Sequence, residues 1–228
     1  MIYNSIVKGR FISRPNRFIA YAEIDGKEEI CHVKNTGRCR ELLIPEADII
    51  LEISDNPNRK TKFDLISVYK NGRLINIDSQ APNKIAAELL PKLFPDYIIK
   101  PEQKYKNSRF DFYLESANKR AFAEVKGVTL ENENIVMFPD APTERGVKHI
   151  NELIQAAENG FDAYILFIIQ MNQVKYLIPN YETHREFGEA LHLAKQKGVK
   201  ILAYDCIVKE NEITCLLYTS PSPRDAHE

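Results

Sequence analysis

The stretch "RFDFYLESANKRAFAEVKG", residues 109–127, predicts two short strands joined by a polar turn. Apolar residues dominate both strands, yet Asp111 lies in the middle of the first, and Glu124 and Lys126 lie in the second. Alternate residues of a strand share a face, so Glu124 and Lys126 project together, and Asp111 is within reach if the strands pair. Because burying three unpaired charges is very costly, a divalent cation held by the two carboxylates would remove that cost.

The spacing D-x12-E-x-K on adjacent strands is the pattern that a metal-dependent phosphodiesterase needs. Mg²⁺, or Mn²⁺ in its place, takes hard oxygen ligands and keeps several waters, so one or two carboxylates suffice. A lysine beside the cation can orient the attacking water and neutralise negative charge on a phosphate. We therefore predict Asp111, Glu124 and Lys126 as catalytic residues. The alternative is an ordinary Glu-x-Lys ion pair, which occurs often by chance.

The residues around this pair of strands predict a domain of alternating helices and strands. Apolar residues recur at helical spacing within residues 81–97, where Asn83 can cap the helix. Strands are predicted at about 98–105, 109–115 and 120–128, followed by a helix that ends at Gly160. A near-continuous apolar strand (161–170), a helix (about 183–197) and a last strand (199–208) complete the order αβββαβαβ.

The first 80 residues are instead rich in short β-prone segments separated by turn signals. Five strands are predicted, within residues 16–24, 28–34, 48–54, 63–70 and 73–79. Five strands with no clear helix favour a small OB-like β-barrel. The chain is therefore predicted to hold an OB-like barrel at residues 1–82 and a domain with a mixed sheet and helices at residues 83–214. The predicted fold class is a two-domain α+β or α/β protein.

Composition and charge indicate which classes of partner the protein can have. The net charge of the 228 residues is −1, but residues 1–40 hold eight Lys or Arg against four acids, which predicts a local basic surface. No CxxC pair and no apolar run long enough to span a membrane occur, and no signal peptide is recognisable at the amino terminus. These features predict a cytoplasmic protein with free thiols and no membrane partner. They leave the oligomeric state open.

Two basic segments are candidates for contact with nucleic-acid phosphates. Asn35, Thr36, Arg38 and Arg40 lie in "KNTGRCREL" (34–42), which is either a phosphate-binding loop or an ordinary turn with surface charges. Arg14 and Arg17 can extend the same surface, whereas Phe18 is predicted to be a core residue rather than a base-stacking one. Arg145 and Lys148 lie near the start of a helix, where they either hold substrate phosphate or belong to a solvated face.

The last segment, "CLLYTSPSPRDAHE" (215–228), differs in composition from the rest of the chain. The order of its residues resembles the translation of a sequencing adaptor that was read in frame. We predict that residues 215–228 are not native, and we leave them out of the reasoning on the fold. The alternative is a disordered tail rich in serine and proline.

Resemblance to known families adds to these inferences. The αβββαβ order is similar to the core of the PD-(D/E)xK nucleases, whose first helix or first strand often adds a third acid; here these carry Glu88 and Glu102. Seven segments in order also resemble the sugar fermentation stimulation protein family, among them "HVKNTGRCREL", "SRFDF", "EVKGVTL" and "FPDAPTERGVKHINEL". That resemblance implies an OB-like domain, a PD-(D/E)xK-like domain and DNA binding. It places the metal ligands at Glu102, Asp111 and Glu124, with Glu88 as the alternative third acid.

The function predicted from these observations is that of a DNA-binding protein with a Mg²⁺-dependent nuclease site, acting as an endo- or exonuclease. The first alternative is a non-catalytic DNA-binding regulator of sugar-utilisation genes, a role that the family resemblance implies. A metal-stabilised structural domain is the second alternative. Of these three functions, only that of the nuclease requires two carboxylates and a lysine to be held close together.

Overall fold

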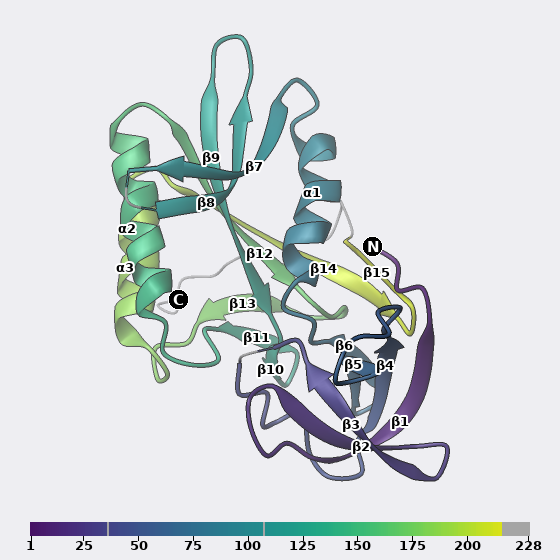
Figure 1. Cartoon of the computed structure of the whole chain (residues 1–228). Coiled ribbons are helices and arrows are strands. Elements are labelled where there is room, and N and C mark those ends of the chain that lie inside the picture. The colour runs from purple at the N-terminus through teal and green to yellow at the C-terminus, as the bar shows by residue number, and fades with distance from the viewer. Residues whose placement is uncertain (36, 107, 216–228) are drawn as a thin grey trace.

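The computed structural model describes residues 1–35, 37–106 and 108–215, which form a β-barrel followed by a helix-flanked sheet (Figure 1). Thr36, one of the predicted phosphate contacts, lies outside the described residues, as do residues 216–228 of the predicted non-native tail. Cys215, the first residue of that predicted tail, is the last residue of a strand. No helix in the described part of the chain is both long enough and apolar enough to cross a membrane.

Five strands close into a barrel in the first domain. They are β1 (Ile6–Ser13), β2 (Ile19–Ile24), β3 (Lys27–Val33), β4 (Asp48–Ile53) and β5 (Phe63–Lys70). Antiparallel pairs run in the order β3-β2-β1-β4-β5, and a parallel pairing of β3 with β5 closes the ring. A further strand, β6 (Arg73–Asn76), extends the sheet beyond β5. The predicted OB-like barrel is therefore confirmed.

Strand β1 was not among the predicted strands, because Lys8, Gly9 and Arg10 interrupt its apolar alternation. The strand forms because it pairs on both sides, with β2 and with β4. Glycine is needed at position 9, since a Cβ there would lie 2.8 Å from the carbonyl oxygen of Glu23 on β2. Pairing across the barrel thus outweighs a weak local β signal.

The second domain is a six-stranded mixed sheet with helices on both faces (Figure 1). Its elements are α1 (Ala81–Leu93), β7 (Ile98–Tyr105), β8 (Ser108–Glu115), β9 (Arg120–Val128), α2 (Glu144–Glu158), β12 (Asp162–Ile169), α3 (Arg185–Gln196), β14 (Lys200–Lys209) and β15 (Glu212–Cys215). The strand order is β15-β14-β12-β9-β8-β7, in which β9, β12 and β14 are parallel. The predicted mixed sheet is confirmed.

A second, three-stranded sheet was not predicted. It consists of β10 (Leu130–Asn132), β11 (Ile135–Phe138) and β13 (Tyr176–Pro179). Each strand has only three or four residues, too few for apolar alternation to distinguish a strand from a loop. β11 pairs in parallel with β13, which lies about 40 residues further along the chain, so a long-range pairing creates this sheet.

Helix α1 begins earlier than Asn83, the residue predicted to cap it. Gln80 is the N-cap, and Ala81 and Pro82 form the first turn, where proline is well tolerated. The prediction that Asn83 caps the helix is therefore wrong. Its side chain lies inside the first turn and donates a hydrogen bond to Asp111 instead.

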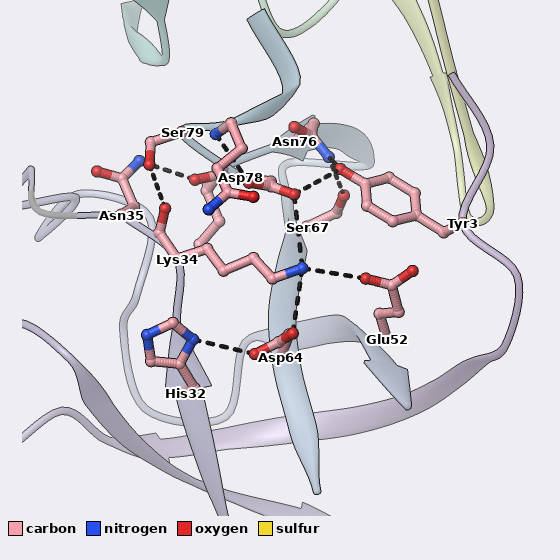
Figure 2. A network of polar contacts seen from close by, with 12 residues as sticks. Tyr3, His32, Lys34, Asn35, Glu52, Asp64, Ser67, Asn76, Asp78 and Ser79 are labelled. Carbon is pink, nitrogen blue, oxygen red and sulfur yellow. Dashed lines mark hydrogen bonds and ion pairs between the residues drawn. The ribbon is translucent and has the colours of Figure 1, made fainter. Parts of the chain in front are cut away.

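A network of buried polar side chains lies between the barrel and the second domain (Figure 2). The Lys34 Nζ lies 3.1 Å from carboxylate oxygens of both Glu52 and Asp64, and 3.9 Å from Asp78. Asp64 also accepts hydrogen bonds from both terminal nitrogens of Arg59, at 2.6 and 2.7 Å. Burial acts to raise the pKa of Asp64, but its bonds to Arg59 and Lys34 outweigh this and lower it to about 2.

The same network joins the two domains. The Gln170 side chain, just after β12, donates to Asn76 Oδ1 at 2.8 Å and to the Asp78 carbonyl at 3.0 Å. Asn76 in turn donates to the Tyr3 hydroxyl, and that hydroxyl donates to Asp78 (Figure 2). Because these side chains are almost fully buried, the bonds set how the barrel meets the sheet.

Candidate functional site

The candidate site lies where β8 and β9 part. Within the described residues, the ladder between these strands ends at the pair Phe112–Ala123. β9 continues to Val128 with β12 as its partner. A gap therefore opens beside β9 at the point where Asp111, Glu124 and Lys126 occur.

Asp111 is held in this gap from two directions. Its Oδ1 accepts a hydrogen bond from the Asn83 side chain of α1 at 2.8 Å, and its Oδ2 accepts one from the Val125 backbone N–H at 2.8 Å. The carboxylate thus takes the place of a missing ladder partner for β9. Burial raises the pKa of Asp111, and the nearby charge of Glu124 adds to this rise.

Glu124 lies across the gap from Asp111 and is 3% exposed. Its Oε1 accepts from the Lys126 Nζ at 2.6 Å and is also bonded to the His149 ring. Among the described residues, its Oε2 is buried and has no hydrogen-bond partner. Burial acts to raise the pKa of Glu124, but the bonds from His149 and Lys126 outweigh burial and lower it.

His149 belongs to this site, although its contact with Glu124 was not predicted from the sequence. It lies on α2, with its Nδ1 bonded to Glu124 Oε1, while its Nε2 accepts from Arg145 Nε at 3.4 Å. Because Nε2 accepts from Arg145, Nδ1 is the nitrogen that donates to Glu124 Oε1. A signal for this was present, because His149 falls in the buried stripe with Gly146, Ile150 and Leu153.

The two predicted third acids lie outside this gap. Glu102 lies on the edge strand β7 with a positive φ of 51°, and its exposed side chain pairs with Arg109 at 3.3 Å. Glu88 pairs with the amino terminus of the chain at 3.0 Å. Across residues 1–35, 37–106 and 108–215, no three His, Cys, Asp or Glu side chains are placed so that together they could hold a metal. The structure thus brings together Asp111, Glu124 and Lys126, without a third acid.

The predicted basic residues of α2 have different surroundings. Arg145 is exposed and contacts His149, so it lies at the edge of the site. Lys148 points along the helix toward Glu152, with its Nζ 4.0 Å from the carboxylate. Thr143 is the N-cap of α2, since its hydroxyl accepts from the Gly146 N–H. Of the two basic residues, Arg145 is therefore the one linked to Glu124.

A groove of about 590 Å³ lies on the barrel beside the second domain, and we call it the arginine groove. Among the described residues, its lining holds no acid and four arginines: Arg14, Arg17, Arg38 and Arg40. The side chains of Arg38 and Arg40 are exposed and form no ion pair with any described residue. A surface of this kind attracts anions although the protein as a whole has a net charge of −1.

Arg14 in the wall of this groove and Asn35 beside it have structural roles. The Arg14 guanidinium donates to the carbonyl oxygens of Arg17, Asn35, Gly37 and Arg38, at 2.6 to 3.0 Å. The Asn35 side chain donates to the Ile77 carbonyl and accepts from the Gly37 N–H. The terminal nitrogens of Arg14 and the side-chain amide of Asn35 thus shape the loop, whereas Arg38 and Arg40 are exposed.

A smaller pocket of about 330 Å³ adjoins the arginine groove, and we call it the interdomain pocket. Gly37 and Ala141 line both the groove and the pocket. The pocket also reaches Gly127, next to Lys126, and Thr143 at the start of α2. The pocket therefore adjoins the arginine groove and reaches β9 one residue beyond Lys126.

Phe18 is 52% exposed, so the prediction that it is a core residue is wrong. It lies just before β2, and the Arg17 guanidinium is 5.9 Å from the centre of its ring. Ala20, two residues further along, enters the barrel core instead. The sequence could not distinguish these positions, because the strand begins one residue after Phe18.

Comparison with known families covers most of the chain. The family model described as the SfsA N-terminal OB domain matches residues 12–77. A second, described as the sugar fermentation stimulation protein RE domain, matches residues 80–212. Sugar fermentation stimulation protein homologs from Clostridium beijerinckii and Desulfitobacterium hafniense (strain Y51) are 62% and 60% identical to this chain. Each alignment covers 93% of this chain, and 96% and 94% of the two relatives.

A solved structure is similar over nearly the whole length. It is described as the structure of Pyrococcus furiosus SfsA in complex with Ca²⁺. The two chains are 29% identical, the TM-score is 0.86, and 98% of each chain is covered. The barrel and the mixed sheet therefore have the same arrangement in both proteins.

Proposed function

Because this chain belongs to the sugar fermentation stimulation protein family, we propose that it binds DNA and hydrolyses its phosphodiester bonds with a bound divalent cation. The observation that carries the proposal is the pair of carboxylates at the parting of β8 and β9. Asp111 and Glu124 meet there beside Lys126, and one oxygen of Glu124 is buried without a partner in the described structure. A buried carboxylate oxygen of this kind is costly unless a ligand satisfies it.

The residues fit Mg²⁺ or Mn²⁺. Either cation accepts one or two carboxylates and completes its shell with waters and substrate phosphate oxygens, so two acids are sufficient. The relative from Pyrococcus furiosus, whose structure is described as a complex with Ca²⁺, supports a site for a hard cation in this family. Glu124 Oε2 and Asp111 would be the ligands from this chain.

The remaining groups hold and complement this pair. A divalent cation at the two carboxylates would polarise a phosphoryl oxygen and lower the pKa of a bound water. His149 and Lys126 bind Glu124 Oε1, which keeps Oε2 turned away from them and toward the gap. Asn83 and the Val125 N–H fix Asp111. The Lys126 ammonium can donate to the phosphate as negative charge develops there.

DNA binding is assigned to the arginine groove. Arg17, Arg38 and Arg40 project from loops of the barrel, and phosphate oxygens accept hydrogen bonds from such side chains whatever the base sequence. The interdomain pocket adjoins this groove at Gly37 and Ala141 and is lined by Gly127, which follows Lys126 on β9, and by Thr143 at the start of α2. Binding and hydrolysis are thus assigned to different domains of one molecule.

A second candidate function is a DNA-binding regulator that does not cleave. The observation in its favour is that no third acid joins Asp111 and Glu124 among the described residues. A cleavage assay on DNA with Mg²⁺, Mn²⁺ or EDTA separates the two functions. Hydrolysis that requires the cation supports the nuclease, whereas binding without hydrolysis under every condition supports the regulator.

We expect Mg²⁺ or Mn²⁺ to raise the melting temperature of the wild type and not that of an Asp111→Ala variant. A ligand that binds only the folded protein stabilises it, by about 2.7 kcal/mol at 100 times the Kd, which is about 5 °C or more for a protein of this size. Differential scanning calorimetry with and without the cation measures this shift.

Glu102→Ala is the matched control for that experiment. Glu102 is an exposed acid on the neighbouring strand, paired only with Arg109 in the described structure, so its removal should leave the cation-dependent shift unchanged. If Glu102→Ala abolishes the shift while Asp111→Ala keeps it, the ligands have been misassigned. If titration calorimetry detects no cation binding to the wild type, the carboxylate pair is not a metal site.

We expect the double variant Arg38→Ala, Arg40→Ala to bind DNA more weakly and with a flatter salt dependence. Each lost phosphate contact lowers the slope of log Kd against log salt by about one, so the pair should lower it by about two. Fluorescence anisotropy at several salt concentrations, in EDTA to prevent cleavage, measures the slope. The matched control is Arg109→Ala with Arg185→Ala, two exposed arginines paired with Glu102 and Glu189. An equal loss in both double variants would show that net charge, rather than the groove, sets the affinity.

A further inference from the structure

We infer that the arginine groove receives single-stranded DNA, with one base stacked on Phe18. The inference rests on the proposed function, because it names the form of DNA that the proposed site would take. Three observations carry it: an exposed aromatic ring beside Arg17 of the groove, a lining without acids among the described residues, and the small size of the adjoining pocket.

Phe18 offers a stacking surface that bases in a duplex cannot use. Its ring is 52% exposed, and the guanidinium of Arg17, which lines the groove, lies near it at 5.9 Å. In a duplex the faces of the bases are covered by their neighbours, whereas in a single strand they are free to stack on an aromatic side chain. A base that is free of Watson–Crick pairing would cover the exposed ring of Phe18 next to Arg17.

The lining of the groove complements a phosphate backbone. Four arginines and no acid line it, and the Arg14 guanidinium holds the loop backbone so that Arg38 and Arg40 project from a fixed frame. Arginines beside an aromatic platform are the combination that binds single strands with little sequence preference. The arginines thus bind the phosphate backbone and Phe18 binds a base, so mutations can test the two contributions separately.

The way onward from the groove is too narrow for a duplex. The interdomain pocket has a volume of about 330 Å³, at the lower end of the range for small-ligand sites. Its walls are closely packed: a Cβ on Gly37 would lie within 2.4 Å of Asp140 Oδ2, and one on Gly127 within 2.6 Å of Gln170 Oε1. The major groove of a duplex is alone about 12 Å wide, so a pocket of this volume admits part of an unpaired strand and not a duplex.

The test compares a labelled single strand of about 12 nucleotides with the duplex of the same sequence, both in EDTA. We expect the wild type to bind the single strand more tightly. Phe18→Ala should weaken single-strand binding about tenfold and leave duplex binding and the salt slope unchanged, because stacking involves no phosphate. Phe18→Tyr, which keeps an aromatic face, should restore the affinity. Ile30→Ala removes another exposed apolar side chain of the barrel, on β3, and should have no effect.

Two results would overturn the inference. One is a wild type that binds the duplex as tightly as the single strand. The other is a Phe18→Ala variant that loses no single-strand affinity or loses the same factor for both forms. Cation-dependent cleavage, measured on the same preparations, decides the proposed function separately. A protein that cleaves DNA but shows either result keeps its function and loses only the preference for single strands.

Discussion

Replacing Lys126 with alanine is expected to slow DNA cleavage by about 100-fold or more while leaving most of the DNA affinity intact. The magnitude is that of removing one donor that stabilises developing charge in a transition state. The Lys126 Nζ lies 2.6 Å from Glu124 Oε1, and its side chain is largely buried, so no other described lysine can take its place at the carboxylate pair. The affinity persists because the groove arginines belong to the other domain.

Single-turnover cleavage with saturating enzyme measures this effect, because it separates the chemical step from binding. Lys104→Ala, at an exposed lysine on the edge strand β7, is the matched control and should cleave at the wild-type rate. Lys126→Arg keeps the positive charge but changes its position, so it shows whether cleavage depends on the charge alone or also on where the charge lies. Wild-type cleavage by Lys126→Ala would mean that any nuclease activity in the preparation comes from another protein. The regulator would then be the function to retain, provided that DNA binding persists.

Replacing Lys34 with methionine is expected to lower the free energy of unfolding by about 3 kcal/mol. The change removes the cation that Glu52, Asp64 and Asp78 share. Asp64 keeps its two bonds to Arg59, so we expect the lower end of the ~3–5 kcal/mol that a buried charge without its partner typically costs. Methionine keeps most of the length of the lysine side chain, so the loss reports charge rather than an empty cavity. Urea denaturation gives the free energy from the midpoint and the slope of the transition.

Lys100→Met is the matched control, because Lys100 forms a single exposed ion pair with Glu115 at 3.2 Å. Exposed pairs contribute about 0.2–1 kcal/mol, so the same substitution should have little effect there. Adding Glu52→Gln to Lys34→Met should recover part of the loss, since one uncompensated charge is removed. Equal losses in Lys34→Met and Lys100→Met would show that the buried network does not depend on its lysine.

The pH dependence gives an independent check on this network. The pKa of Asp64 is lowered to about 2 in the folded protein, below the value of about 3.9 expected in an unfolded chain. The stability that its ion pairs contribute is therefore present above about pH 4 and is lost as the pH falls toward 2. The difference between wild type and Lys34→Met should accordingly be largest near neutral pH and should shrink in acid.

Much of the fold follows from local sequence patterns. Apolar periodicity identified α1, α2 and α3 and the strands β7, β8, β9, β12 and β14, because each is long enough for its period to show. The barrel was recognisable from β2, β3, β4 and β5, whereas the fifth predicted segment holds β6, which extends the sheet beyond β5. The family was recognisable from its signature segments, which the family models and the relatives confirm. The short strands β10, β11, β13 and β15 escaped prediction, as did β1 with its charged interior.

The sequence by itself determined the family, the two-part architecture and the residue types of the candidate site, since these depend on patterns along the chain. Only the tertiary structure decided which polar and charged side chains are in contact. It placed His149 on Glu124, 25 residues away, and Gln170 on Asn76, 94 residues away. It also turned Glu102 to solvent and left Phe18 exposed at the arginine groove. The physical reason is that a buried charge is stabilised by whatever donor the packing brings to it, and that donor lies on another element.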